Sequence, residues 1–114
     1  MKIFSVIVSY NPNLRNLIEL ISHLNKQNVN AVVVDNNSNS VFEENEVGCK
    51  VINLKENLGI AVAQNKGLEY VKNNNGDYVV FFDQDSSIPN DYILNLMSDY
   101  QFLINQGIKV GAIG

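Results

Sequence analysis

The sequence has little cysteine, histidine or basic charge, and each shortage excludes a class of protein. Its 114 residues include one cysteine, Cys49, and one histidine, His23. A single cysteine cannot form an internal disulfide, and the two residues offer no cluster of soft ligands for zinc, so a bound metal needs oxygen ligands. Eight basic residues against twelve acidic ones give a net charge of −4. With the basic residues scattered, this charge argues against nucleic acid and anionic membranes as partners.

Long apolar runs are also missing. The longest are a few residues, whereas roughly 18 to 20 are needed to span a bilayer. The first residues, Met1-Lys2-Ile3, lead directly into a strand-like run without a signal-peptide cleavage site. We therefore predict a cytoplasmic protein. Its length suits one domain, near the lower limit for a sheet covered on both faces.

Short apolar runs alternate with helical patterns along the chain. Apolar, β-branched runs predict strands at 3–9, 31–34, 50–54, 79–82 and 109–114, and helical spacing predicts helices at 14–24, 60–71 and 93–104. Asn11 and Pro12 fit the N-cap and first position of the first helix, and 41–48 is acidic and unpatterned. The order β-α-β-β-α-β-α-β makes the helices crossovers between parallel strands. It predicts an α/β fold: a Rossmann-like, mostly parallel sheet covered by helices and incomplete at the C-terminus.

The strand at 79–82 is followed directly by Asp83 and Asp85. Four consecutive β-favouring residues predict a strand buried on both faces, and ligands of such sheets bind beyond the carboxyl ends of the strands. If the chain stays extended, the two acids share a side, roughly 6 to 7 Å apart. Their repulsion, about 2 to 3 kcal/mol at an effective dielectric near 20, would be reversed by a divalent cation. A solvated loop with a cap at Ser86 or Ser87 explains the same residues, so the pattern alone leaves both interpretations open.

The predicted helix at 60–71 has an apolar face of small residues, Ala61, Ala63 and Gly67, which permits close approach to a sheet or a ligand. Packing explains this face, but Asn65 beside it is equally able to face a polar ligand. The sequence has neither a P-loop nor a dinucleotide-binding fingerprint. A nucleotide would therefore have to be bound by a different kind of site.

Four segments together resemble the N-terminal half of a family 2 glycosyltransferase of GT-A fold, with bacterial rhamnosyltransferases the most similar. They are VIVSYN at 6–11, VVDNNS at 33–38, NLG at 57–59 followed by Ala61, Ala63, Asn65 and Gly67, and FDQD at 82–85. Each motif alone is loose. Four in this order and spacing, over nearly all of the chain, are specific.

The resemblance implies a nucleotide-sugar site formed by the strand ends. Ser9 and Tyr10 would flank the base, and Asn65 would belong to the same site. Asp35 would accept a hydrogen bond from the imide N–H of uracil or thymine, a donor that cytosine lacks. The implied donor is a UDP or dTDP sugar, and the implied acceptor is a saccharide.

The resemblance also implies a metal-dependent, inverting transferase of polysaccharide biosynthesis, with rhamnose as one candidate sugar. Asp85 would be the direct ligand of Mg²⁺ or Mn²⁺, and Asp83 would contact ribose or a water on the metal. The general base of the family lies beyond the D-x-D strand, so we expect it after Gly114. Residues 1–114 would then be the donor-binding part without the acceptor-binding part, inactive alone, from a protein at the inner face of the cell membrane.

Two departures from the family pattern are visible: no Arg or Lys closely follows Asp35, and Asn36 stands where relatives often have a second Asp. An interrupted sheet would leave Val110 and Ile113 at an open edge, through which the chain could self-associate. Two alternatives stay open. A phosphoacceptor receiver domain has this length and alternation but needs acids after its first strand, where this chain has Ser9 and Tyr10. A non-catalytic nucleotide-binding domain is the other.

Overall fold

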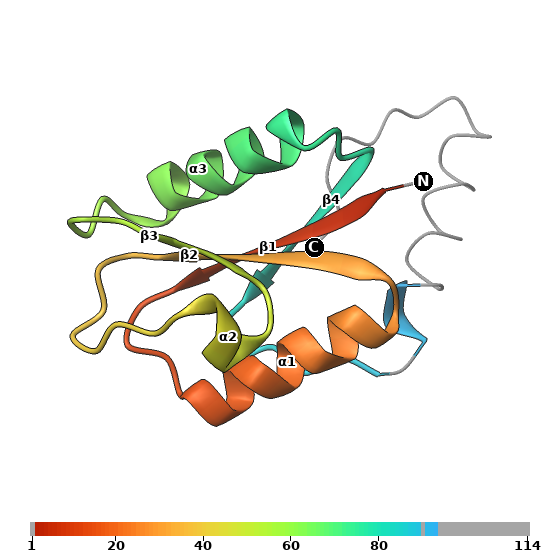
Figure 1. Cartoon of the computed structure of the whole chain (residues 1–114), viewed down its shortest axis with the longest axis horizontal. Helices are drawn as coiled ribbons and strands as arrows, with labels where there is room; N and C mark the ends of the chain where they lie inside the picture. Colours follow the sequence, from red (N-terminus) through yellow and green to blue (C-terminus); the bar gives the residue numbers. More distant parts are fainter. Residues whose placement is uncertain (1, 90, 94–114) are drawn as a thin grey trace.

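The computed structural model describes residues 2–89 and 91–93 and contains a four-stranded sheet with helices on both sides (Figure 1). Its elements are β1 (Ile3–Ser9), α1 (Leu14–Lys26), β2 (Val29–Asp35), α2 (Glu44–Val47), β3 (Lys50–Asn53), α3 (Ile60–Asn73) and β4 (Tyr78–Asp83). The strand order is β3-β2-β1-β4, and every neighbouring pair is parallel. The predicted α/β fold with a parallel sheet is therefore confirmed.

Alternation along the central strands decides which helix covers which face. In β1, Ile3 and Ile7 point to the core that α1 completes with Leu17, Leu20, Ile21 and Leu24. Phe4 and Val6 point to the opposite core, which α3 completes with Ala63 and Val71. Figure 1 shows α1 and α2 on one side of the sheet and α3 on the other. The sheet is covered on both faces, as predicted, because successive strand side chains point in opposite directions.

The small residues of α3 serve packing. Ala63 and Gly67 are buried, and a Cβ at Gly67 would lie 2.5 Å from Cγ1 of Val6 and 3.3 Å from Cγ2 of Val34. Only glycine therefore lets α3 approach β1 and β2 this closely. Ala61, predicted on the same face, is exposed instead.

The start of α1 differs from the prediction. The N-cap is Asn13, whose side chain accepts a hydrogen bond from the N–H of Asn16, so the expectation of Asn11 as N-cap and Pro12 as first helical residue was wrong. Asn11 has a left-handed backbone (φ 46°), and its side chain accepts from the N–H of Asn39. Because the side-chain oxygen of Asn11 accepts this hydrogen bond between loops, Asn11 does not cap the helix. The buried face of α1 includes Leu20, whereas Leu14 and Ile18, although apolar, are exposed.

The acidic segment 41–48, predicted to be unpatterned, contains the short helix α2. Phe42 and Val47 anchor it to the core, and Glu43 and Glu46 form a reciprocal capping box at its start. Four residues are too few for a helical period to be recognised, and glutamate replaces the Ser or Thr that usually marks such a box.

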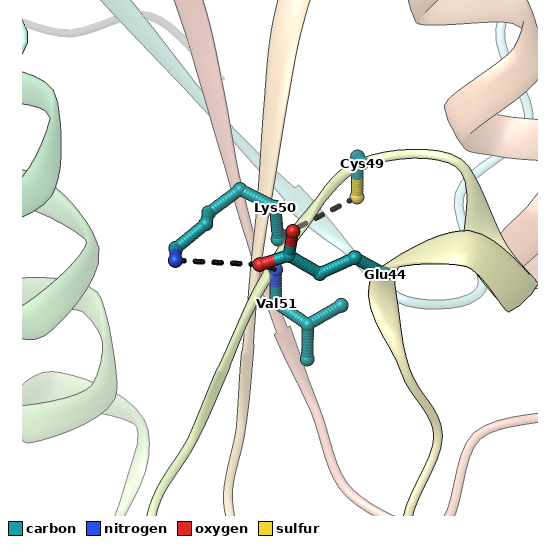
Figure 2. Close-up of polar contacts among 4 residues, drawn as sticks. All are labelled: Glu44, Cys49, Lys50 and Val51. Carbon is teal, nitrogen blue, oxygen red and sulfur yellow. Dashed lines mark hydrogen bonds and ion pairs between the residues drawn. The ribbon is translucent and has the colours of Figure 1, made fainter.

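Strand β3 lies at one edge of the described sheet, and Glu44 covers part of its backbone (Figure 2). One carboxylate oxygen of Glu44 accepts a hydrogen bond from the N–H of Val51 at 3.4 Å and lies 3.3 Å from Nζ of Lys50. Lys50 in turn lies over the ring of Tyr70, 5.7 Å from its centroid. Charged side chains held in this way oppose pairing of the edge with another chain.

Strand β4 forms the other edge of the described sheet, and only Val80 of it is fully buried. The expectation of a strand buried on both faces therefore does not hold within the described residues, because β1 is its one neighbour there. The predicted helix beyond Ile93, the strand at 109–114 and the open edge at Val110 and Ile113 lie outside the described residues. In the part of the chain that the structure describes, no helix is long and apolar enough to cross a membrane.

Candidate functional site

A cavity of about 500 Å³ opens at the carboxyl ends of β1, β2 and β4. The chain runs from β1 outward through β2 to β3 and then crosses to β4 on the other side of β1. This reversal is the topological switch point at which open α/β sheets bind ligands. The cavity is lined by Val8, Ser9, Tyr10, Asn36, Asn57, Gly59, Ile60, Asp83, Gln84, Asp85 and Ser86. Four of the residues predicted from the sequence, Ser9, Tyr10, Asp83 and Asp85, therefore meet in one place.

A buried carboxylate holds together the loops after β1 and β2. Asp35, only 2% exposed, accepts hydrogen bonds on Oδ1 from Oγ of Ser9 (2.7 Å) and Oγ of Ser38 (2.6 Å). Its Oδ2 accepts from the N–H of Ser38 at 2.8 Å. Oγ of Ser38 also accepts from the N–H of Asn11, which extends the network into the β1 loop. The register that pairs Ser9 with Asp35 brings these groups together.

Asp35 supports the wall of the cavity, whereas Ser9, Tyr10 and Asn36 form its surface. A carboxylate can accept about four hydrogen bonds, and three donors from the described residues occupy Asp35. The fourth acceptor position receives no hydrogen bond that the structure shows among the described residues. Ser38 was not predicted as part of the site, although its place three residues after an Asp at a strand end is typical of a side-chain-stabilised turn.

Asp83 and Asp85 are exposed and line the cavity from the side of β4. The chain does not stay extended past Asp83, because the N–H of Ser86 donates to the carbonyl of Asp83 at 3.0 Å and closes a turn. The spacing expected for an extended D-x-D therefore does not apply. Within residues 2–89 and 91–93, no group of three or more His, Cys, Asp or Glu side chains could enclose a metal. Two carboxylates nevertheless fit Mg²⁺, which proteins commonly hold through one or two carboxylates, substrate phosphates and water.

The amino end of α3 forms a third wall. Gly59, with φ 88°, is its N-cap and provides no side chain, and Gly59 and Ile60 both line the cavity. The first intrahelical hydrogen bond recorded there runs from the N–H of Ala63 to the carbonyl of Gly59. The N–H groups before it carry the positive end of the helix dipole, which favours an anion. Asn36 fixes the preceding turn by accepting from the N–H of Leu58 at 3.3 Å.

Asn65 is the one predicted site residue that neither lines the cavity nor supports its wall through a recorded contact. It is exposed on α3, beyond the helix start that faces the cavity. Asn36, Asn57 and Gln84 line the cavity and were not predicted from the sequence. Strand register and turn geometry bring these three residues to the cavity, and the sequence pattern reveals neither.

Cys49 lies at the amino end of β3, whereas the cavity lies at the carboxyl ends of the strands. Burial raises the pKa of its thiol to about 12, a hydrogen bond with the backbone of Val33 lowers it, and the charge of Glu44 raises it. The thiol donates to the carbonyl of Lys50 at 3.4 Å (Figure 2). These contacts indicate a packing role for Cys49, because a protonated, half-buried thiol is a poor nucleophile.

Comparison with known proteins relates the chain to a family and to an individual protein. The family model described as Glycosyl transferase family 2 matches residues 5–105. The chain is also similar to a dTDP-rhamnosyl transferase, RfbF, of Shigella flexneri, with 39% identity over 111 residues. That alignment covers 95% of this chain and 36% of the relative, so the chain spans about a third of the relative's length.

Proposed function

The chain belongs to glycosyl transferase family 2, and from this premise we propose that its cavity binds the nucleoside-diphosphate part of a sugar donor. The single observation that carries the proposal is the composition of the cavity. An exposed aromatic ring, Tyr10, and two carboxylates, Asp83 and Asp85, line one space at the switch point. These groups suit a base at one end and a metal-bound diphosphate at the other. Membership of the family excludes the receiver-domain alternative.

We propose a dTDP sugar as the donor, with rhamnose as its sugar. The support is the 39% identity to a dTDP-rhamnosyl transferase. Thymine presents an imide N–H, which the remaining acceptor position of Asp35 would accept at the wall formed by Ser9 and Asn36. Tyr10 is 46% exposed and offers a ring against which the base can stack. Asn65 lies on α3 outside the residues that line the cavity, so this site gives it no contact with the base or the diphosphate.

Asp85, with Asp83 beside it, would hold Mg²⁺ or Mn²⁺. A cation bound there would act as a Lewis acid for the negative charge that grows on the departing diphosphate. The N–H groups at the start of α3 would bind phosphate oxygens in place of the missing basic residue. The start of α3 would thus be the phosphate-binding element of a chain that has no P-loop.

We propose that transfer proceeds with inversion in one step. The acceptor hydroxyl attacks C1 of the sugar, the bond from C1 to the diphosphate oxygen breaks, and the hydroxyl proton passes to a carboxylate base. The acceptor site and that base would lie outside the donor-binding part described above. The chain would then bind the donor without transferring its sugar.

Calorimetric titration with dTDP, UDP, GDP and CDP, each with and without Mn²⁺, tests the proposal. We expect dTDP and UDP to bind more tightly than CDP and GDP, and Mn²⁺ to strengthen binding. Equal affinity for all four nucleotides would contradict the base site, and affinity independent of Mn²⁺ would contradict the metal site.

A further inference from the structure

The residue between the two acids makes a contact that the donor site does not yet explain. Oε1 of Gln84 accepts a hydrogen bond from the N–H of Tyr10 at 2.8 Å, and Nε2 of Gln84 donates to the carbonyl of Tyr10 at 3.3 Å. One carboxamide thus satisfies both polar backbone groups of one residue. The two residues are 74 positions apart in the sequence, follow the paired strands β1 and β4, and both line the cavity.

The geometry follows from the way the two strands end. Val8 and Asp83 are the last paired residues of β1 and β4. After them the backbone of β4 turns away, closed by the bond from Ser86 to Asp83. The side chain of Gln84 then provides the donor and the acceptor that a further backbone pair would have supplied. An amide side chain can do this because it has the same two groups as a peptide bond.

We propose that Gln84 is a positioning residue for the nucleotide: by binding the backbone of Tyr10, it fixes the place from which the Tyr10 ring projects relative to Asp83 and Asp85. This inference rests on the proposed function. Tyr10 as a whole is 46% exposed, so its own packing does not hold it firmly. Without the carboxamide, the loop after Ser9 would populate other conformations, and the apparent dissociation constant would rise in inverse proportion to the fraction of molecules that keep the binding conformation.

The chemistry at this position restricts which residues can replace Gln84. Glutamate keeps the acceptor for the N–H of Tyr10 but has no donor for its carbonyl, and asparagine is one methylene shorter. Methionine has similar length and neither strong donor nor strong acceptor. Gln84→Met is therefore the test variant, because it removes both bonds without placing a third charge beside Asp83 and Asp85.

Gln27 provides a matched control. Its Nε2 donates to the carbonyl of Pro89 at 3.0 Å, and its Oε1 accepts from the N–H of Ile93 at 2.9 Å. Gln27→Met therefore removes the same two kinds of hydrogen bond at a residue that is not part of the cavity. It separates a general loss of stability from a local effect on Tyr10.

The experiment measures amide hydrogen exchange of Tyr10 by NMR, and calorimetric affinities for dTDP and for inorganic diphosphate, both with Mg²⁺. In Gln84→Met we expect exchange at Tyr10 to accelerate about tenfold or more, and the dissociation constant for dTDP to rise about 5- to 30-fold, as the loss of two hydrogen bonds implies. Affinity for inorganic diphosphate should stay within about twofold, because Tyr10 serves the base end. Gln27→Met should leave all three quantities near those of the unmodified chain.

Unchanged exchange at Tyr10 in folded Gln84→Met would overturn the contact itself. Faster exchange with unchanged dTDP affinity, or an equal loss for diphosphate, would overturn the positioning role. If the unmodified chain bound diphosphate but showed no preference for dTDP over it, the base site of the proposed function would fail, and the positioning role with it. The exchange measurement would still decide whether Gln84 holds Tyr10, so the two failures are distinguishable.

Discussion

Replacing Asp35 with asparagine keeps the shape of the side chain and removes its charge, at the buried centre of the loops that frame the cavity. The carboxylate accepts three hydrogen bonds, of 2.6, 2.7 and 2.8 Å. In Asp35→Asn, one orientation of the amide directs an N–H at the N–H of Ser38. The other orientation directs the amide N–H at the hydroxyl oxygens of Ser9 and Ser38. Both hydroxyl groups must then rotate, and their protons lose the acceptor that Oδ1 of Asp35 provides. No orientation preserves all three bonds.

The magnitude follows from these contacts. A hydrogen bond to a charged group contributes about 1.5 to 3 kcal/mol and a neutral one about 0.5 to 1.5 kcal/mol. The stability lost through three weakened hydrogen bonds is regained in part, because folding of the variant no longer has to remove a charge from water. We therefore expect Asp35→Asn to lower the free energy of unfolding by about 1 to 3 kcal/mol.

Urea denaturation followed by circular dichroism measures this loss. Asp77→Asn is the matched control, since exposed Asp77 also accepts a backbone hydrogen bond, from the N–H of Lys2 at 2.7 Å. We expect that control to change stability by less than about 0.5 kcal/mol. Equal, small losses in both variants would refute the view that Asp35 holds the two loops together.

The same variant tests the proposed contact with the base. If Asp35 accepts the imide N–H, Asp35→Asn should weaken dTDP binding by about 1.5 to 3 kcal/mol, which is roughly 10- to 150-fold. The comparison with CDP is decisive. An equal loss for CDP would show that Asp35 acts through the fold of the loops and not through the base.

Three further predictions concern single residues. Asp85→Ala should abolish the dependence of nucleotide affinity on Mn²⁺, as measured by calorimetry. Because Asp85 is exposed, the circular dichroism spectrum should stay unchanged. If the affinity still depended on Mn²⁺, Asp85 would not be a metal ligand. Gly67→Ala should lower the free energy of unfolding by about 1 to 3 kcal/mol despite the better helix propensity of alanine, since its Cβ would meet Val6 at 2.5 Å; a gain in stability on denaturation would contradict the close packing of α3. Burial raises the pKa of the Cys49 thiol from 9.0 to about 12, so the unfolded chain loses the thiol proton at a lower pH than the folded chain. The contribution of Cys49 to the free energy of unfolding should therefore be complete below pH 9 and be lost as the pH rises toward 12. If stability depended on pH in the same way in Cys49→Ala, this prediction would be contradicted.

Much of the fold could be predicted from hydrophobic pattern alone. The apolar runs that became β1 and β2 are unambiguous because they are buried on both faces, and the glycine that ends the turn before α3 marks that helix clearly. The start of α1 could not be decided in this way. Asn11 and Asn13 are both good N-caps, and a contact of Asn11 with Asn39, distant in sequence, determines which one is used.

The candidate site was predictable to the extent that it depends on strand ends. Asp83 and Asp85 follow a strand directly, so parallel topology was enough to bring them to the same edge as Ser9 and Tyr10. The role of Gln84 was not predictable, because it depends on the register between β1 and β4 and on the turn after Asp83. Neither the register nor the turn leaves a pattern in the local sequence.

The central claim is that one cavity holds a metal-bound nucleoside diphosphate between Tyr10, the start of α3 and the two acids. Paramagnetic broadening by Mn²⁺ in the presence of dTDP, measured on the amide signals of the isotopically labelled chain, locates the metal directly. We predict selective broadening of Asp83, Asp85 and Ser86, followed by Tyr10 and Ile60, while Gly48 at the opposite end of the sheet keeps its intensity. Broadening centred on other residues, or none with dTDP bound, would contradict the claim.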